Sequence, residues 1–268
     1  MQTENENARR NKLFVFGLLS VGFAVLISNI INKNAADVTT DFLMAFLSGG
    51  LFVLSIIIAV QFRLGGGHGK AYLLFAGFAS LWFAAELTWL NSEVISRLLP
   101  FPEQGDWFYL AGYSLLFVFS LYYLKPFRLA ISNKLLAYAA LASLIFFIPT
   151  IYSTYSLNRD ASIFEILWGA VYPIADTMIL FPAVLGVLLF IKGKVGLFWS
   201  FTCIAIILNI IADSGFFFLD IDKSSYSSNP INILYMWSYI LFAFGIYSHV
   251  RLFKKPKMKS FGKTDDLK

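Results

Sequence analysis

The amino-acid sequence predicts an all-α, polytopic integral membrane protein with eight membrane-spanning helices. Of the 268 residues, 58% are hydrophobic and only 14% are charged, whereas soluble domains carry roughly 25% charged residues. Several stretches with almost no charge are long enough to cross a hydrocarbon core about 30 Å thick. Backbone in lipid must satisfy its own hydrogen bonds, and the alternating pattern of a membrane barrel is absent, so the spans are expected to be helices.

Hydropathy divides the chain into a short polar start, a membrane domain and a basic end. The eight expected spans are 13–31, 42–62, 71–95, 106–124, 134–154, 162–191, 195–219 and 230–252. The first span is predicted to stay uncleaved, because no small-residue cleavage site follows it. Residues 1–12 are then a cytoplasmic segment, 13–252 the membrane domain and 253–268 a basic tail.

Lys and Arg fall mainly on one side of the predicted membrane. With the N-terminus inside, the inner segments hold 17 of the 21 basic residues, and the outer segments hold Lys33, Arg97, Arg159 and Lys223. Short cytoplasmic loops are enriched in Lys and Arg, so we expect a cell-membrane protein with both termini in the cytoplasm. Contact with anionic lipid headgroups explains the basic inner face, and no nucleic-acid binding is expected.

The two halves of the membrane domain, 13–125 and 134–252, resemble each other. The segment LFVFSLY ends the fourth span, and LFAFGIY ends the eighth at an offset of 125 residues. Ala85–Glu86 in the third span matches Ala212–Asp213 in the seventh at an offset of 127. Units with an even number of spans repeat in parallel, about an axis along the membrane normal. We therefore expect a four-plus-four internal repeat.

Three acids fall inside the predicted spans: Glu86 on the third, Asp176 on the sixth and Asp213 on the seventh. A charged carboxylate at the bilayer centre costs about 2.5–3.5 kcal/mol on insertion scales, so such groups face the bundle interior and find partners. No Lys or Arg lies mid-span to neutralise them. We expect an outward-facing acidic and aromatic pocket. The alternative is that each acid is a hydrogen-bonded clamp between helices.

The candidate ligand-binding residues are these acids and the polar or aromatic side chains expected near them. They are Glu86, Asp176, Asp213, Trp82, Trp89, Asn209, Tyr113, Tyr172 and Tyr239. Pro173 removes a backbone donor within the sixth span and is expected to kink it. Asp106 is expected to be the N-cap of the fourth span.

Several chemistries are not expected. The single Cys203 permits no internal disulfide or thiolate cluster. The only histidines, His68 and His249, are placed at membrane edges and offer no intramembrane pair for haem. The segment 64–71 lacks the first Gly and the Ser or Thr of a phosphate loop, so a cytoplasmic turn is expected. With no mid-span Lys for a retinal Schiff base and no nucleophile–base or metal-ligand cluster, we expect no enzyme activity, cofactor or metal.

The third span is followed by PFPEQGDWFYLAGY (100–113), and this segment resembles a loop of the multi-pass membrane sensor regions that precede diguanylate cyclase (GGDEF) domains in many bacteria. That loop typically reads PFPSxADxxYLxxYPL, and the matching residues are Pro100, Phe101, Pro102, Asp106, Tyr109, Leu110 and Tyr113, with Ser114 where the pattern often has proline. Two later segments are also similar, through Tyr172, Pro173 and Asp176, and through Ala212–Asp213 with Asn229–Pro230. The resemblance covers spans three to eight and implies a sensing or ligand-binding module.

Two functions fit these features. The first is a sensor that binds a small cationic or apolar molecule, or responds to pH, and passes its signal to a partner protein because no output domain is expected after the last span. The second is a secondary transporter or proton-coupled carrier, favoured by Pro173 and Asp176 in one interrupted span. Against the carrier, only one span is clearly broken and the inner half is nearly devoid of polar groups. The expected partners are the bilayer, a small molecule and a signalling protein.

Overall fold

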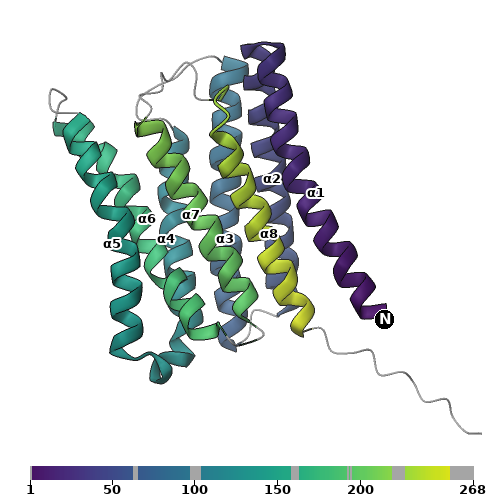
Figure 1. Ribbon diagram of the computed structural model, residues 1–268, viewed down its shortest axis with the longest axis vertical. Coiled ribbons are helices and arrows are strands. Elements are labelled where there is room, and N and C mark those ends of the chain that lie inside the picture. The colour runs from purple at the N-terminus through teal and green to yellow at the C-terminus, as the bar shows by residue number, and fades with distance from the viewer. Residues whose placement is uncertain are drawn as a thin grey trace, which may run out of the picture.

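The computed structural model describes residues 2–62, 66–96, 104–157, 163–191, 193, 195–218 and 227–253. Within these ranges the chain forms eight long helices and no strand, and each helix is long and apolar enough to cross a membrane (Figure 1). The predicted all-α, eight-helix membrane architecture is therefore confirmed.

The helices follow one another with short connections. They are α1 (Gln2–Ile31), α2 (Lys33–Gln61), α3 (Gly66–Leu90), α4 (Gln104–Leu124), α5 (Asn133–Leu157), α6 (Ile163–Phe190), α7 (Gly196–Phe218) and α8 (Asn232–Phe253). A π-helical turn, Asn91–Ser96, continues α3, and a 3-10 turn, Lys125–Ala130, follows α4. We call the top of Figure 1, where α1 meets α2 and where α4, α6 and α8 begin, the upper end. It is the end predicted to face outward.

Several helix boundaries differ from the predicted spans. Helix α1 begins at Gln2 and α2 at Lys33, well before residues 13 and 42, because hydropathy marks the lipid-facing part of a helix and polar residues extend it further. Asn32 separates the two helices, and its side chain accepts a hydrogen bond of 2.8 Å from the Ala35 N–H, as an N-cap does.

Two local predictions are wrong. Helix α3 begins at Gly66, so most of the glycine-rich segment 64–71 is helical and not a turn. Helix α4 begins at Gln104, which puts Asp106 in its first turn and not at the N-cap.

Helix α6 contains both Pro173 and Pro182 and continues through them. The predicted loop residues Pro100, Phe101 and Pro102, the side chain of His68 and residues 254–268 of the basic tail lie outside the described part of the chain.

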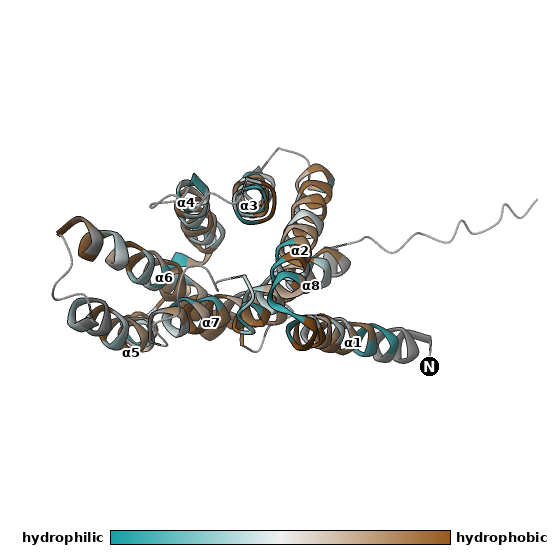
Figure 2. Cartoon of the chain, turned by 90° about the horizontal axis from the view of Figure 1, so that it is seen from above, coloured by the Kyte–Doolittle hydropathy of each residue, from teal (hydrophilic) through white to brown (hydrophobic). Residues whose placement is uncertain are grey.

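The outer surface of the bundle is apolar, as contact with lipid requires. Large side chains such as Ile30, Phe46 and Ile163 are exposed, and a continuous apolar surface of this kind marks a membrane interface. Viewed along the bundle, α1 and α5 lie at its two edges (Figure 2). The interior is rich in aromatic rings, of which the largest buried ones are Trp82, Trp199, Tyr72, Phe75, Phe78, Phe119, Phe198 and Phe242.

The helix contacts of the two halves correspond. Helix α3 packs on α4 as α7 packs on α8, and α2 packs on α3 as α6 packs on α7. Between the halves, α2 packs on α8 while α6 packs on α4, which is the same contact after exchange of the halves. In Figure 2 the members of α2/α6, α3/α7 and α4/α8 lie on opposite sides of the centre. This arrangement supports the predicted repeat. The first helices deviate, because α1 packs on α8 and α5 packs on α7.

Candidate functional site

Glu86 lies on the inner face of α3 and is only 4% exposed. The Tyr239 hydroxyl of α8 donates a hydrogen bond of 2.5 Å to its Oε1. The Tyr109 hydroxyl of α4 also interacts with the Glu86 carboxyl. The acid therefore joins three helices through tyrosine hydroxyls, and no Lys, Arg or His of the described chain contacts it.

Asp176 and Asp213 form a second acidic centre between α6 and α7. The Tyr113 hydroxyl of α4 lies 2.8 Å from Asp176 Oδ1 and 3.4 Å from Asp213 Oδ2. Tyr235 of α8 donates a hydrogen bond to Asp213 Oδ1, and the two carboxyl groups interact directly with each other. Asp176 is 3% exposed. Four helices thus converge on this pair.

A fourth acid, Asp106, lies closer to the upper end. The Tyr172 hydroxyl of α6 donates a hydrogen bond of 2.6 Å to Oδ1 of Asp106, in the first turn of α4. The ring of Tyr172 also packs edge-on against Tyr113, with 6.3 Å between ring centres. Tyr172 therefore connects Asp106 with the centre that holds Asp176 and Asp213. We call the whole set the acid–tyrosine cluster; it comprises Glu86, Asp106, Asp176, Asp213, Tyr109, Tyr113, Tyr172, Tyr235 and Tyr239.

The tyrosines exchange partners between the two halves of the chain. Glu86 interacts with Tyr109 of its own half and with Tyr239 of the other half. Asp213 interacts with Tyr235 of its own half and with Tyr113 of the other half. Exchange of α3 with α7 and of α4 with α8 maps one arrangement onto the other. Asp176 has no acidic counterpart in this scheme, so the second centre carries one carboxyl more than the first.

Aromatic rings close the cluster on its lower side. The Trp82 indole packs on Tyr113 and Tyr239, with 5.3 and 5.9 Å between ring centres. On its other side it packs on Phe78 at 4.7 Å and on Phe242 at 6.3 Å. We call Trp82, Phe78, Phe242, Phe75 and Phe119 the aromatic floor, since all five are buried and in ring contact.

The floor depends on a close approach of α4 to Trp82. The indole Nε1 donates a hydrogen bond of 3.3 Å to the Tyr109 carbonyl. A Cβ at Gly112 would lie 2.6 Å from that same Nε1, closer than real Cβ atoms come to a neighbour. Small residues allow such contacts between membrane helices. Gly112 is therefore required for Trp82 to pack edge-to-face against the tyrosines.

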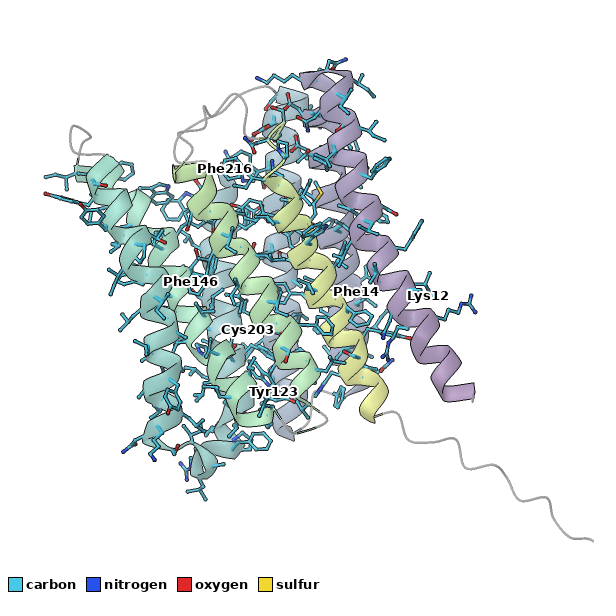
Figure 3. All side chains as sticks on the ribbon, in the orientation of Figure 1. Lys12, Phe14, Tyr123, Phe146, Cys203 and Phe216 are labelled. Carbon is cyan, nitrogen blue, oxygen red and sulfur yellow. The ribbon has the colours of Figure 1, made fainter. Side chains whose placement is uncertain are left out.

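Below the floor lies a second, smaller polar group. His249 of α8 is 1% exposed and its Nε2 lies 3.1 Å from the Tyr123 hydroxyl of α4. Tyr72 of α3 also interacts with Tyr123. Figure 3 labels Tyr123 near the lower end and Phe216, which stacks on Tyr235, near the upper end. His249 lies near the lower end of α8, at the membrane edge where it was predicted, but its side chain is buried in the bundle. The view that the inner half is nearly devoid of polar groups is wrong.

The structure brings together six of the nine predicted site residues: the three acids Glu86, Asp176 and Asp213, and the three tyrosines Tyr113, Tyr172 and Tyr239. Trp82 lies under them as part of the floor. The other two lie apart in their contacts. The Trp89 indole packs against Gly105 at the start of α4, and the Asn209 side chain donates to the Ala205 carbonyl of its own helix.

Two members of the cluster, Tyr109 and Tyr235, were not expected there. A signal for both exists in the sequence. Asp106-x-x-Tyr109-x-x-x-Tyr113 and Asn232-x-x-Tyr235-x-x-x-Tyr239 have the same spacing at an offset of 126 residues. Residues four apart share a helix face, so each pattern presents two hydroxyls on the inner face. Of the residues that carry the sensor resemblance, Asp106, Tyr109, Tyr113, Tyr172, Asp176 and Asp213 lie in the cluster.

At the upper end, Asp41 of α2 is buried and accepts a hydrogen bond of 2.8 Å from Ser227. Asp37 and Glu93 interact electrostatically with it. Within the described ranges, no group of three or more His, Cys, Asp or Glu side chains is arranged to hold a metal ion. No protein-family model matches the chain, and neither a curated protein nor a solved structure matches it. Function must therefore be inferred from the geometry of the acid–tyrosine cluster.

Proposed function

We propose that this membrane protein is a sensor or small-molecule-binding module whose receiving site is the acid–tyrosine cluster. One observation carries the proposal. Three carboxyl groups, those of Glu86, Asp176 and Asp213, converge inside the bundle, and their only described polar partners are tyrosine hydroxyls and one another. Such a site has an excess of hydrogen-bond acceptors and negative charge, and it is lined by aromatic faces. A small organic cation complements both features.

The aromatic floor favours a sensor over a carrier. A sensor needs access from one side only, and the edge-to-face rings of Trp82, Phe78 and Phe242 separate the cluster from the lower end. The resemblance to membrane sensor regions also favours a sensor, because several of the residues that carry it, such as Asp106, Tyr113 and Asp176, belong to the acid–tyrosine cluster. Signal transfer to a partner protein belongs to the same proposal.

A proton-coupled carrier is the second candidate function. The pair His249 and Tyr123 favours it, because a polar group on the lower side is what a path across the membrane needs. Pro173 and Pro182 in α6 also favour it, since interrupted helices are common at transporter binding sites. In this alternative the floor must open once in each transport cycle.

The test begins with the purified protein in detergent. Mass spectrometry identifies co-purifying small molecules, and thermal denaturation is then followed with a panel of primary and quaternary organic ammonium chlorides against sodium chloride. A bound ligand at a hundred times its Kd stabilises a protein by about 2.7 kcal/mol. We expect stabilisation of the wild type and of the control Asp37→Asn, and its loss in Glu86→Gln and Asp213→Asn.

Failure of every cation to stabilise the wild type would overturn the proposed binding function. Stabilisation that survives both Glu86→Gln and Asp213→Asn would place the site elsewhere. Accumulation of the stabilising cation in proteoliposomes under a pH gradient would replace the sensor by the carrier.

A further inference from the structure

The Asp176–Asp213 pair has more acceptors than donors unless it holds a proton. Ionised carboxylates only accept hydrogen bonds, yet the two carboxyl groups interact directly and share the Tyr113 hydroxyl. That hydroxyl has a single proton, which it donates to Asp176 at 2.8 Å. Its contact with Asp213 Oδ2 is longer, at 3.4 Å, and the direct contact between the two carboxyl groups has no donor when both are ionised. One proton on the pair supplies that donor.

The surroundings supply no other neutralising group. The titratable groups that interact with the pair are Tyr113 from α4, Tyr172 from α6, and Tyr235 and Tyr239 from α8. Glu86 of α3 and Tyr109 of α4 adjoin this set through Tyr239. All are acids or hydroxyls. Helix α5 packs on α6 and α7, and it brings Thr150 to Ser214. No Lys, Arg or His side chain of the described residues lies against either carboxyl, so a proton is the cation that the pair itself can hold.

The path to the pair runs from the upper end. Asp106 lies in the first turn of α4, and Tyr172 donates to it at 2.6 Å. The Tyr172 ring packs against Tyr113, and its hydroxyl interacts electrostatically with both carboxyls of the pair. Tyr113 is nine residues below the start of α4, a depth of about 14 Å at 1.5 Å per residue. On the lower side the pair is followed by the rings of the aromatic floor, which carry no hydroxyl or carboxyl.

We propose that Asp176 and Asp213 form a single-proton site inside the membrane, which exchanges its proton with the upper face through Tyr172 and Asp106. In each transfer the proton leaves one oxygen and binds the next. The Tyr172 hydroxyl releases a proton to one neighbour as it accepts one from the other, so the tyrosine stays neutral. The inference rests on the proposed function in one respect: a cation that enters the cluster displaces this proton, so that binding and proton release are linked.

Infrared difference spectroscopy tests the site in full-length protein reconstituted in one orientation in liposomes. The signal is the C=O stretching band of a protonated carboxylic acid, recorded after a pH step on one side of the membrane. We expect the band to respond to pH on the upper side and not on the lower side. Asp176→Asn and Asp213→Asn should each remove it, because the proton is shared, whereas Glu86→Gln should leave it.

Two conservative variants test the roles of the tyrosines. Tyr172→Phe should keep the band and slow its response by roughly a hundredfold, the lower end of what a positioned proton-transfer group contributes. Tyr113→Phe should shift the band, because Asp176 loses its donor. Tyr152→Phe, on the exposed face of α5, is the matched control and should change neither rate nor band.

Several outcomes would overturn the proton site: a band that responds from the lower side, a band that only one of the two Asp variants removes, or no band at any pH. None of these outcomes changes the result for cation stabilisation of the wild type, which is measured in a separate experiment. If the band behaves as expected and no ammonium salt binds, the proton site stands and the proposed cation ligand is wrong.

Discussion

The Tyr239 hydroxyl on α8 lies 2.5 Å from the Glu86 carboxyl on α3, and this hydrogen bond connects the two halves of the chain. Its counterpart runs from Tyr113 on α4 to the centre that holds Asp213 on α7. Each acid is therefore held by both halves, through one tyrosine of its own half and one of the other. Movement of one half against the other must stretch both contacts, which gives a membrane sensor a direct way to report occupancy of the cluster.

We expect Tyr239→Phe to destabilise the protein. It removes one hydroxyl from a buried carboxyl, and a buried polar group left without its partner costs about 1–3 kcal/mol. The lost packing is small because the ring remains against Trp82. Thermal denaturation in detergent measures the effect. Tyr152→Phe, which removes a hydroxyl at the lipid-facing surface, should leave the melting temperature unchanged. Equal effects of the two variants would contradict the role assigned to the Glu86 contact.

Gly112→Ala should be costly although alanine is the better helix former. The new Cβ would meet the Trp82 indole, and overpacking of this kind costs typically about 1–3 kcal/mol. Gly50 on α2 is the matched control, because nothing lies within 4 Å of a Cβ there. Gly50→Ala should be neutral or slightly stabilising, as helix propensity alone predicts.

A second change separates overpacking from other causes. The double variant Gly112→Ala with Trp82→Phe has a smaller ring under the tyrosines, so part of the lost stability should return. If Trp82→Phe adds its own cost to that of Gly112→Ala without recovery, the clash between these two residues is not the cause.

The architecture followed from the sequence because its causes are local. Runs without charge must be helical in lipid, and the described helices occupy every predicted span. Helix ends such as Gln2 and Gly66 were misjudged, because hydropathy does not detect a helix that continues into water. Asp176 and Asp213 were correctly grouped, because an acidic side chain in a membrane span must face the bundle interior.

The partners of the acids could not be predicted in the same way. Which helix faces which is decided by packing, and a tyrosine on the lipid side and one on the core side look alike in an apolar sequence. Tyr109 and Tyr235 required the additional observation that two tyrosines four residues apart recur in both halves. The burial of the His249 side chain was missed for the same reason. Its position near the end of the last span says nothing about the inward direction of its side chain.

The correspondence between Asp106 and Asn232 leads to a prediction about side-chain chemistry. Asp106 accepts from Tyr172 through Oδ1, and an asparagine amide oxygen can accept the same bond. Asp106→Asn should therefore remain close to wild-type stability. Asp106→Leu removes the acceptor from a partly buried hydroxyl and should cost about 1–3 kcal/mol. Equal loss in the two variants would show that the negative charge and not the hydrogen bond matters.

The predicted orientation can be tested with the single native cysteine removed. Cys203 is buried in α7, so Cys203→Ser should give an unreactive background that still folds. Asn34→Cys places an exposed thiol at the upper end, and Asn133→Cys places one at the lower end, at the first residue of α5. The excess of Lys and Arg on the lower side predicts that this side is cytoplasmic. A membrane-impermeant maleimide should therefore label Asn34→Cys in intact cells, and label Asn133→Cys only after the membrane is opened. The reverse labelling pattern would invert the protein in the membrane, and the acid–tyrosine cluster would then open towards the cytoplasm.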